Sequence, residues 1–161
     1  MMGFLTWSKH KLAEALSAGC YVDRPVLNAD VLEAWCRTNH IAIDITPASK
    51  LHCTVLYSVK DIRYHPDFRL DAQTIEIQPS QFAPRLQTLG DMGTVVLKFQ
   101  SVFLHHRWTQ FLNLGALTTY PTYAPHISLA RRGPGSGWKY TLVKPPTFSL
   151  HLGPERVWDL K

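Results

Sequence analysis

Two short segments of the sequence carry the same combination of a histidine and a hydroxyl residue. His52 and Thr54 form the first, and His126 and Ser128 form the second, each pair with one apolar residue between its members. The two segments lie about half the chain apart, and both are rich in β-forming residues. In a strand, residues i and i+2 point to the same face. We therefore expect each histidine to project together with the hydroxyl of its own segment.

Two imidazoles and two hydroxyls around one groove suit the cleavage of a phosphodiester. A neutral imidazole can take a proton from the attacking hydroxyl, and a protonated one can deliver a proton to the leaving oxygen. Imidazole serves both roles because its ordinary pKa of about 6.5 is near working pH. The two hydroxyls can donate hydrogen bonds to the non-bridging phosphate oxygens. This chemistry needs neither a metal nor a cofactor, and we expect none.

Motifs for other chemistries are absent from the sequence. There is no HExxH pattern and no cluster of cysteine and histidine, so a zinc site is not expected. A P-loop, a glycine pattern that opens a dinucleotide-binding helix, and a GxSxG nucleophile motif are also missing. The three cysteines, Cys20, Cys36 and Cys53, are an odd number at wide spacings. They are predicted to be free thiols in a reducing compartment.

Length and composition indicate one globular domain over residues 1–161, or two small lobes that share a core, with no linker between them. Of the 161 residues, 45% are hydrophobic and 18% are charged, which excludes disordered and collagen-like chains. The formal net charge of +5 favours an anionic ligand, although it could serve only solubility. No apolar run approaches the roughly 18 residues of a membrane span. The first ten residues lack the apolar region of a signal peptide, so we expect a cytoplasmic protein without a membrane partner.

The elements that must position the two motifs follow from hydrophobic periodicity. Helices are predicted at Ser8–Ala18, about Ala29–Asn39, and Ser101–Leu114. The second helix has Asn28 or Asp30 as a candidate cap, with Glu33 at the spacing of a capping box. Strands are predicted at Ile41–Ile45, Leu51–Ser58, Ile75–Ile77, Phe82–Leu89, Thr94–Gln100, Tyr123–Ala130, Trp138–Val143 and Thr147–Leu152. Residues 59–72 and 131–137 are predicted loops, and the whole pattern indicates an α+β fold.

The paired motifs resemble those of the two-histidine (2H) phosphoesterase superfamily, which is defined by two His-x-Thr/Ser motifs. The second motif here has Ser128 where threonine is common, which preserves the hydroxyl. The resemblance implies a bilobal α+β fold: two pseudo-symmetric lobes with mainly antiparallel sheets around a central cleft, and helices outside. Within the superfamily, the chain is most similar to the small bacteriophage anti-CBASS phosphodiesterases, which cleave the cyclic di- and trinucleotide signals of bacterial antiphage defence.

The resemblance also implies a reaction. The 2′-hydroxyl of the ligand would attack the phosphorus of a 3′–5′ linkage and form a 2′,3′-cyclic phosphate, which water can open. His52 and His126 would be the base and the acid, in an order that the sequence leaves open. The substrate would be a cyclic di- or trinucleotide, with no stable protein partner, in the cytoplasm of the bacterial host.

Three further residues are candidates for substrate binding, at places comparable to ligand-enclosing segments of the anti-CBASS enzymes. Tyr21 is expected in a loop, where its ring could stack on a base. Trp158, in the C-terminal tail, is either a lid over the ligand or a plug that anchors the terminus. Glu155 could accept a hydrogen bond from an exocyclic amine, or could be solvated or paired with Arg156. Tyr57 is expected on the strand face opposite to Thr54, packed in the core.

Candidate sources of positive charge near the phosphate are Lys50, Arg131 and Arg132, although a solvated loop is the simpler interpretation of all three. Two other functions remain open. One is a 2H enzyme that acts on RNA 2′,3′-cyclic phosphate ends or on 2′–5′ linkages. The other is a non-catalytic sponge that binds cyclic nucleotides, which would not need both histidines.

Overall fold

The structure is a computed structural model that describes residues 19–41, 45–90, 93–131 and 142–160. The predicted helix Ser8–Ala18, most of the predicted strands Ile41–Ile45 and Trp138–Val143, and most of the loop 131–137 lie outside these residues. Within the described residues, no helix has the length and apolar character needed to cross a bilayer.

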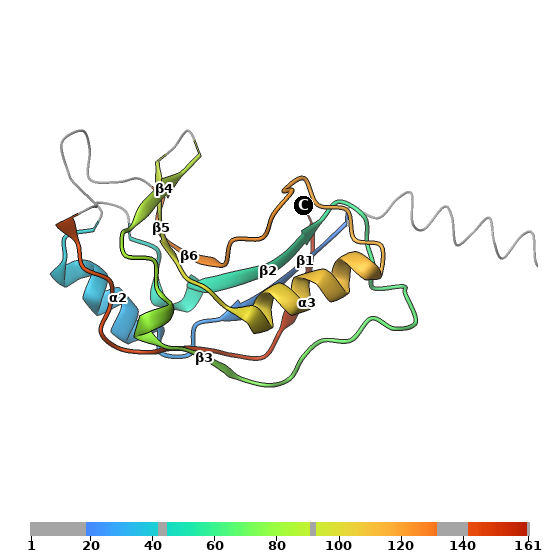
Figure 1. Cartoon of the computed structure of the whole chain (residues 1–161), viewed down its shortest axis with the longest axis horizontal. Helices are drawn as coiled ribbons and strands as arrows, with labels where there is room; N and C mark the ends of the chain where they lie inside the picture. Colours follow the sequence, from blue (N-terminus) through green and yellow to red (C-terminus); the bar gives the residue numbers. More distant parts are fainter. Residues whose placement is uncertain (1–18, 42–44, 91–92, 132–141, 161) are drawn as a thin grey trace, which may run out of the picture.

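A six-stranded antiparallel sheet forms the centre of the molecule (Figure 1). Its strands, in spatial order, are β4 (Gln87–Leu89), β5 (Thr94–Lys98), β6 (His126–Ala130), β2 (His52–Ser58), β1 (Cys20–Pro25) and β8 (Arg156–Asp159). A second sheet pairs β3 (Ile75–Ile77) with β7 (Leu150–Leu152). The helices are α2 (Ala29–Thr38) and α3 (Val102–Asn113), with short 3₁₀ turns η1 (Ala48–Lys50) and η2 (Pro79–Gln81).

The sheet contains the same unit twice. The succession β1-α2-β2 is matched by β5-α3-β6, and the two units meet where β2 pairs with β6 at Cys53 and Ile127. β8 flanks the first unit and β4 the second, so each half has three strands and one helix. This arrangement confirms the predicted α+β fold with two pseudo-symmetric lobes.

Each unit has a β-bulge at the same place. On β1, Val22 pairs with Leu56 and Asp23 with Thr54, so Val55 has no partner. On β5, Val95 pairs with Ala130 and Val96 with Ser128, which leaves Leu129 unpartnered in the same way.

A bulge places two successive side chains on one side of a strand. Accordingly, Val55 and Leu56 are both buried, and so are Leu129 and Ala130.

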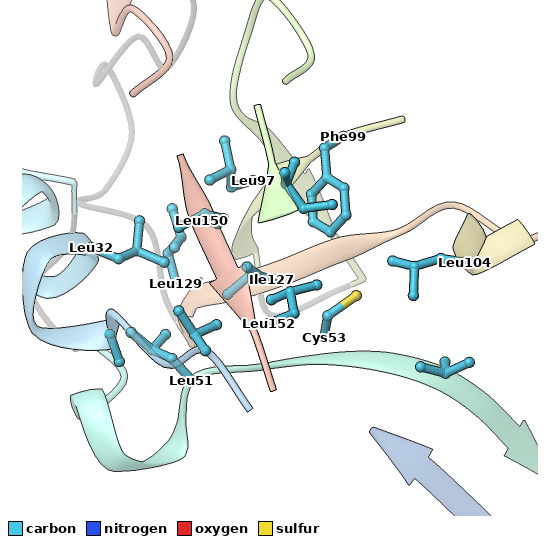
Figure 2. Packing of buried hydrophobic residues seen from close by; sticks show 14 of the residues in the cluster. Leu32, Leu51, Cys53, Leu97, Phe99, Leu104, Ile127, Leu129, Leu150 and Leu152 are labelled. Carbon is cyan, nitrogen blue, oxygen red and sulfur yellow. The ribbon is translucent and has the colours of Figure 1, made fainter. Parts of the chain in front are cut away.

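The core lies on the side of the sheet away from His52 and His126. Cys53 and Ile127, the central residues of the two motifs, are fully buried there. The β3–β7 sheet covers this side, and Figure 2 shows Leu150 and Leu152 of β7 packed beside Ile127. Burial of each such leucine or isoleucine side chain stabilises the fold by about 1.5–3 kcal/mol.

The sequence-based prediction missed β1 and β8 and was wrong in placing Tyr21 in a loop. β1 lacks an alternating apolar pattern because Arg24 occupies a core-facing position after Cys20 and Val22. The Arg24 side chain is fully buried and pairs with the carboxylate of Asp71. Buried charges need such partners, and these come from distant parts of the chain, so no local pattern identifies the strand.

Several predicted boundaries also change. Asn28 is the N-cap residue of α2, but its side chain makes no capping bond, and Asp30 lies within the first turn of the helix. Instead, the Asn28 amide donates to Ser149 O (2.9 Å) and accepts from His151 N (2.9 Å), which ties α2 to the segment around β7. The predicted strand Phe82–Leu89 is reduced to β4, with one isolated bridge at Phe82.

Gly19 offers a test of how tightly β1 is positioned. Its φ is +87°, and an added Cβ would lie 2.2 Å from Ser58 O. We therefore expect Gly19→Ala to lower the free energy of unfolding by more than about 2 kcal/mol, from backbone strain and from the clash. The matched control is Gly90→Ala, because Gly90 also has a positive φ (+69°) but open space around it. Urea unfolding should show a loss of only about 1 kcal/mol for this control; equal losses would contradict the clash.

Candidate active site

The pairing of β2 with β6 brings both motifs to one place on the open face of the sheet. Cys53 lies opposite Ile127 in an antiparallel ladder. His52 therefore lies across from Ser128, and Thr54 across from His126. All four side chains are half-buried and on the face away from the core. The structure thus brings together the four residues that the sequence motifs single out, two imidazoles and two hydroxyls around a pseudo-twofold axis.

Each imidazole is held by a carbonyl of its own chain two residues earlier. His52 Nδ1 lies 2.7 Å from Lys50 O, and His126 Nδ1 lies 2.8 Å from Ala124 O. A carbonyl oxygen only accepts, so Nδ1 is the nitrogen that carries the hydrogen. This leaves Nε2 of both rings available for proton transfer. The identical arrangement in the two halves gives each histidine the ability to act as acid or as base.

A cavity of about 380 Å³ opens beside the motifs. Its lining includes Thr54 and His126, together with the aromatic rings of Tyr21, Tyr57, Trp108, Tyr120 and Tyr123. Most of these rings come from β1, β2 and the segment between α3 and β6. A largely apolar cavity with a few polar groups in its lining is typical of a small-molecule site. The flat faces in this cavity suit nucleobases.

Tyr21, Tyr57 and Trp158 form an aromatic row across three strands. Tyr21 pairs with Tyr57 on β2 and with Trp158 on β8, and residues directly opposite each other share a face. Tyr57 is 40% exposed and Trp158 is 48% exposed. The prediction that Tyr57 packs on the other face was wrong, because the bulge at Val55 returns it to the site.

Trp158 is anchored in a strand rather than lying in a tail. It belongs to β8, and the Arg156 guanidinium lies 5.4 Å from the centre of its ring. Its ring is therefore a fixed part of the aromatic row. The ring of Tyr21 makes an edge contact with His52, with 6.0 Å between the ring centres.

The Tyr21 phenol is held in its neutral form. Burial and the nearby Asp23 carboxylate raise the pKa of Tyr21 well above its usual value, although the Thr54 hydroxyl opposes the shift. The phenol donates to Asp23 Oδ2 (3.2 Å). Asp23 in turn accepts two hydrogen bonds from Arg156 (2.8 and 3.1 Å). This chain of contacts orients the Tyr21 ring and connects β1 to β8 beside the site.

Tyr123 connects the first motif to α3. Its hydroxyl donates to Thr54 O (2.7 Å), and its ring stacks on Trp108 of α3 with 5.8 Å between ring centres. Burial raises the pKa of Tyr123, and the neighbouring Cys53 adds to the shift. Burial also raises the pKa of the Cys53 thiol to about 12, so this cysteine is a packing residue.

Of the three substrate-binding candidates, Tyr21 lines the cavity, Trp158 lies opposite Tyr21 on β8 without lining it, and Glu155 is in the interior. Its side chain is fully buried and accepts two hydrogen bonds from Arg107, at 2.6 and 2.9 Å. It also lies 3.5 Å from the Arg24 guanidinium and accepts from the backbone of Asp71 (2.8 Å). The expectation that Glu155 accepts a hydrogen bond from a base is corrected here. Its carboxylate oxygens already interact with Arg24 of β1 and Arg107 of α3, next to the start of β8. Its suggested partner Arg156 pairs with Asp23 instead.

Two residues of the site have no signal in the sequence. The bulge puts Tyr57 on the face opposite to the one that regular strand alternation predicts. Lys98 is the last residue of β5 and belongs to no motif. Of the cations suggested by the sequence, Lys50 and Arg131 are exposed and do not line the cavity, and Arg132 is outside the described residues. Among the described residues, no group of three or more His, Cys, Asp or Glu side chains is placed to hold a metal ion.

Comparison with known proteins agrees with this geometry. The family model described as "Anti-CBASS protein Acb1" matches residues 18–161. The chain belongs to the anti-CBASS protein Acb1 family. One curated relative, an anti-CBASS protein Acb1 from Sphingomonas paeninsulae, is 30% identical over 149 residues. The match covers 89% of this chain and 23% of the relative, so the chain spans about a quarter of that protein's length.

Solved structures show the same fold at low sequence identity. Escherichia coli LigT in complex with 3′-AMP superimposes with a TM-score of 0.54 and 15% identity, covering 89% of this chain and 95% of LigT. A protein described as a phosphoesterase gives a TM-score of 0.59 and 14% identity, covering 89% and 88% of the two chains. The chain therefore has the 2H phosphoesterase fold found in LigT, as its two motifs predict.

The role of Glu155 can be tested by unfolding. Glu155→Ala leaves Arg24 and Arg107 without their shared carboxylate in the interior, and we expect a loss of about 3–5 kcal/mol in the free energy of unfolding. Arg37→Ala is the control, because its pair with Glu33 is exposed on α2 and its loss should change stability little. An unchanged unfolding curve for Glu155→Ala, together with lost nucleotide binding, would instead support a ligand-binding role.

Proposed function

We propose that this chain is a metal-independent phosphodiesterase that cleaves the 3′–5′ bonds of cyclic di- or trinucleotide signals and so counteracts CBASS antiphage signalling. The observation that carries the proposal is the register of β2 and β6, which sets His52 opposite Ser128 and Thr54 opposite His126. The family supports the biological role, and the 2H fold supports the reaction class. His52, Thr54, His126 and Ser128 are the proposed catalytic residues.

The proposed reaction uses the two imidazoles in turn. Nε2 of one neutral ring takes the proton of the ligand's 2′-hydroxyl as its oxygen forms a bond to phosphorus. Nε2 of the other, protonated ring gives its proton to the 5′-oxygen as the bond from phosphorus to that oxygen breaks. The products are a 2′,3′-cyclic phosphate and a free 5′-hydroxyl. Water can then open the cyclic phosphate with the two roles exchanged.

The hydroxyls and the aromatic row complete the proposed site. Thr54 and Ser128 would donate hydrogen bonds to the non-bridging oxygens, where negative charge accumulates during the transfer. Tyr21, Tyr57 and Trp158 would stack on the bases of the ligand. LigT has been solved with 3′-AMP, a nucleotide that carries its phosphate on the 3′ side of the ribose. A nucleoside phosphate is the class of ligand that we propose for this chain.

The direct test is chromatography of 3′,3′-cyclic GMP-AMP after incubation with the protein in excess EDTA. We expect the wild type to produce a linear nucleotide, and His52→Ala and His126→Ala each to slow this by roughly 10²–10⁴-fold, because each removes one proton-transfer group. His106→Ala is the matched control, since His106 is exposed on α3 and outside the cavity lining. It should cleave at the wild-type rate.

Other outcomes point to the alternatives. A wild type that leaves the ligand intact but retains it on a filter would support a sponge. Neither cleavage nor retention would direct attention to RNA 2′,3′-cyclic phosphate ends and 2′–5′ linkages. Loss of cleavage in EDTA with recovery on adding a divalent cation would contradict the metal-independent scheme.

Stacking on Trp158 can be measured without turnover. A cyclic dinucleotide that lacks both 2′-hydroxyls has no nucleophile and can be used for calorimetry. We expect Trp158→Ala to weaken its binding by about 1–3 kcal/mol, the usual contribution of one stacked base, and Trp158→Phe to retain most of the affinity. Tyr64→Ala serves as the control, because Tyr64 is an exposed aromatic residue outside the aromatic row of Tyr21, Tyr57 and Trp158. Equal affinities for Trp158→Ala and the wild type would remove Trp158 from the site.

A further inference from the structure

Lys98 lies next to His126 on the neighbouring strand. The two residues are directly opposite each other in the β5–β6 ladder, so their side chains share the open face of the sheet. Lys98 is half-buried and lines the 380 Å³ cavity together with Thr54 and His126. It also lines a second cavity of about 330 Å³, beside Gln87 of β4. Lys98 therefore lies between the proposed reacting groups and the second cavity.

The two halves of the site differ at this position. The pairing of Lys98 with His126 corresponds to the pairing of Pro25 with His52 in the other half. Proline carries no charge and no donor. The carbonyl contacts and the bulges match in the two units, but at this ladder position the His126 side has a lysine and the His52 side has a proline. A substrate phosphate between the two histidines therefore meets unequal surroundings.

Among the described residues, Lys98 has no anionic partner, in contrast to the arginines near the site. Arg24, Arg107 and Arg156 are each paired with a carboxylate. Among the described residues that line the two cavities, Lys98 is the only lysine or arginine, and none is an aspartate or glutamate. A lysine in such surroundings is available to an anion of the ligand.

We propose that the Lys98 ammonium binds the substrate phosphate on the His126 side of the site and stabilises the negative charge that builds on its oxygens during cleavage. The proposal rests on the proposed function and assigns to it a phosphate-binding residue outside both motifs. Lys98 forms no covalent bond in this role. Its positive charge acts across a site partly shielded from water, where it counts for more than in bulk solvent.

The test compares the wild type with Lys98→Met, Lys98→Arg and Lys144→Met, the last being an exposed lysine outside both cavities. Cleavage of 3′,3′-cyclic GMP-AMP in EDTA is followed at potassium chloride concentrations from about 20 to 300 mM, a range over which screening changes strongly. Lys98→Met should lower kcat/KM by roughly 10²–10³-fold and flatten the salt dependence. Lys98→Arg should restore most of the rate, and Lys144→Met should match the wild type.

Binding of the cyclic dinucleotide without 2′-hydroxyls separates this proposal from the proposed function. If the wild type binds but does not cleave the ribose substrate, the proposed reaction fails, and weaker, less salt-dependent binding by Lys98→Met still supports phosphate binding. Lys98→Met with turnover and binding within about threefold of the wild type would overturn the proposal. So would a defect that Lys98→Arg does not relieve and that comes with a lower unfolding temperature. A wild type that neither binds nor cleaves would overturn both proposals.

Discussion

The antiparallel pairing of β2 with β6 is the constraint on which the rest of the site depends. One pair of opposing residues, Cys53 and Ile127, determines where both histidines lie. Because side chains alternate along a strand, a slip of one residue in either strand would turn a histidine toward the core and an apolar residue toward the site. The burial of both central residues makes such a slip costly, so the hydrophobic core also maintains the geometry of the polar groups.

The bulges extend this control beyond the motifs. In each unit, the extra residue directly follows the hydroxyl residue, as Val55 and Leu129 show. The bulge leaves the histidine and the hydroxyl on the open face and gives two successive side chains to the core. On β2 it also returns Tyr57 to the open face, where it joins Tyr21 and Trp158. A local irregularity of the backbone thus adds an aromatic surface to a polar site.

The near-symmetry of the two units is broken by what stands opposite each motif. Opposite the first motif, β1 carries Asp23 and Arg24, whose charges are taken up by Arg156, Asp71 and Glu155. Opposite the second motif, β5 carries apolar residues and ends in Lys98. The first unit therefore uses its charges to join distant segments of the chain. The second unit has a positive charge that faces the cavity.

The sequence by itself determined the fold class and the four motif residues, because strand alternation is local and places i and i+2 on one face. It also predicted β2, β3 and both described helices, whose periodicity comes from their own residues. Only the tertiary structure decided where the side chains of Tyr57, Glu155 and Lys98 lie. Their surroundings are set by a bulge, by buried ion pairs and by cross-strand register, and each of these depends on residues far away in the chain. For the same reason β1 and β8 have no recognisable local pattern.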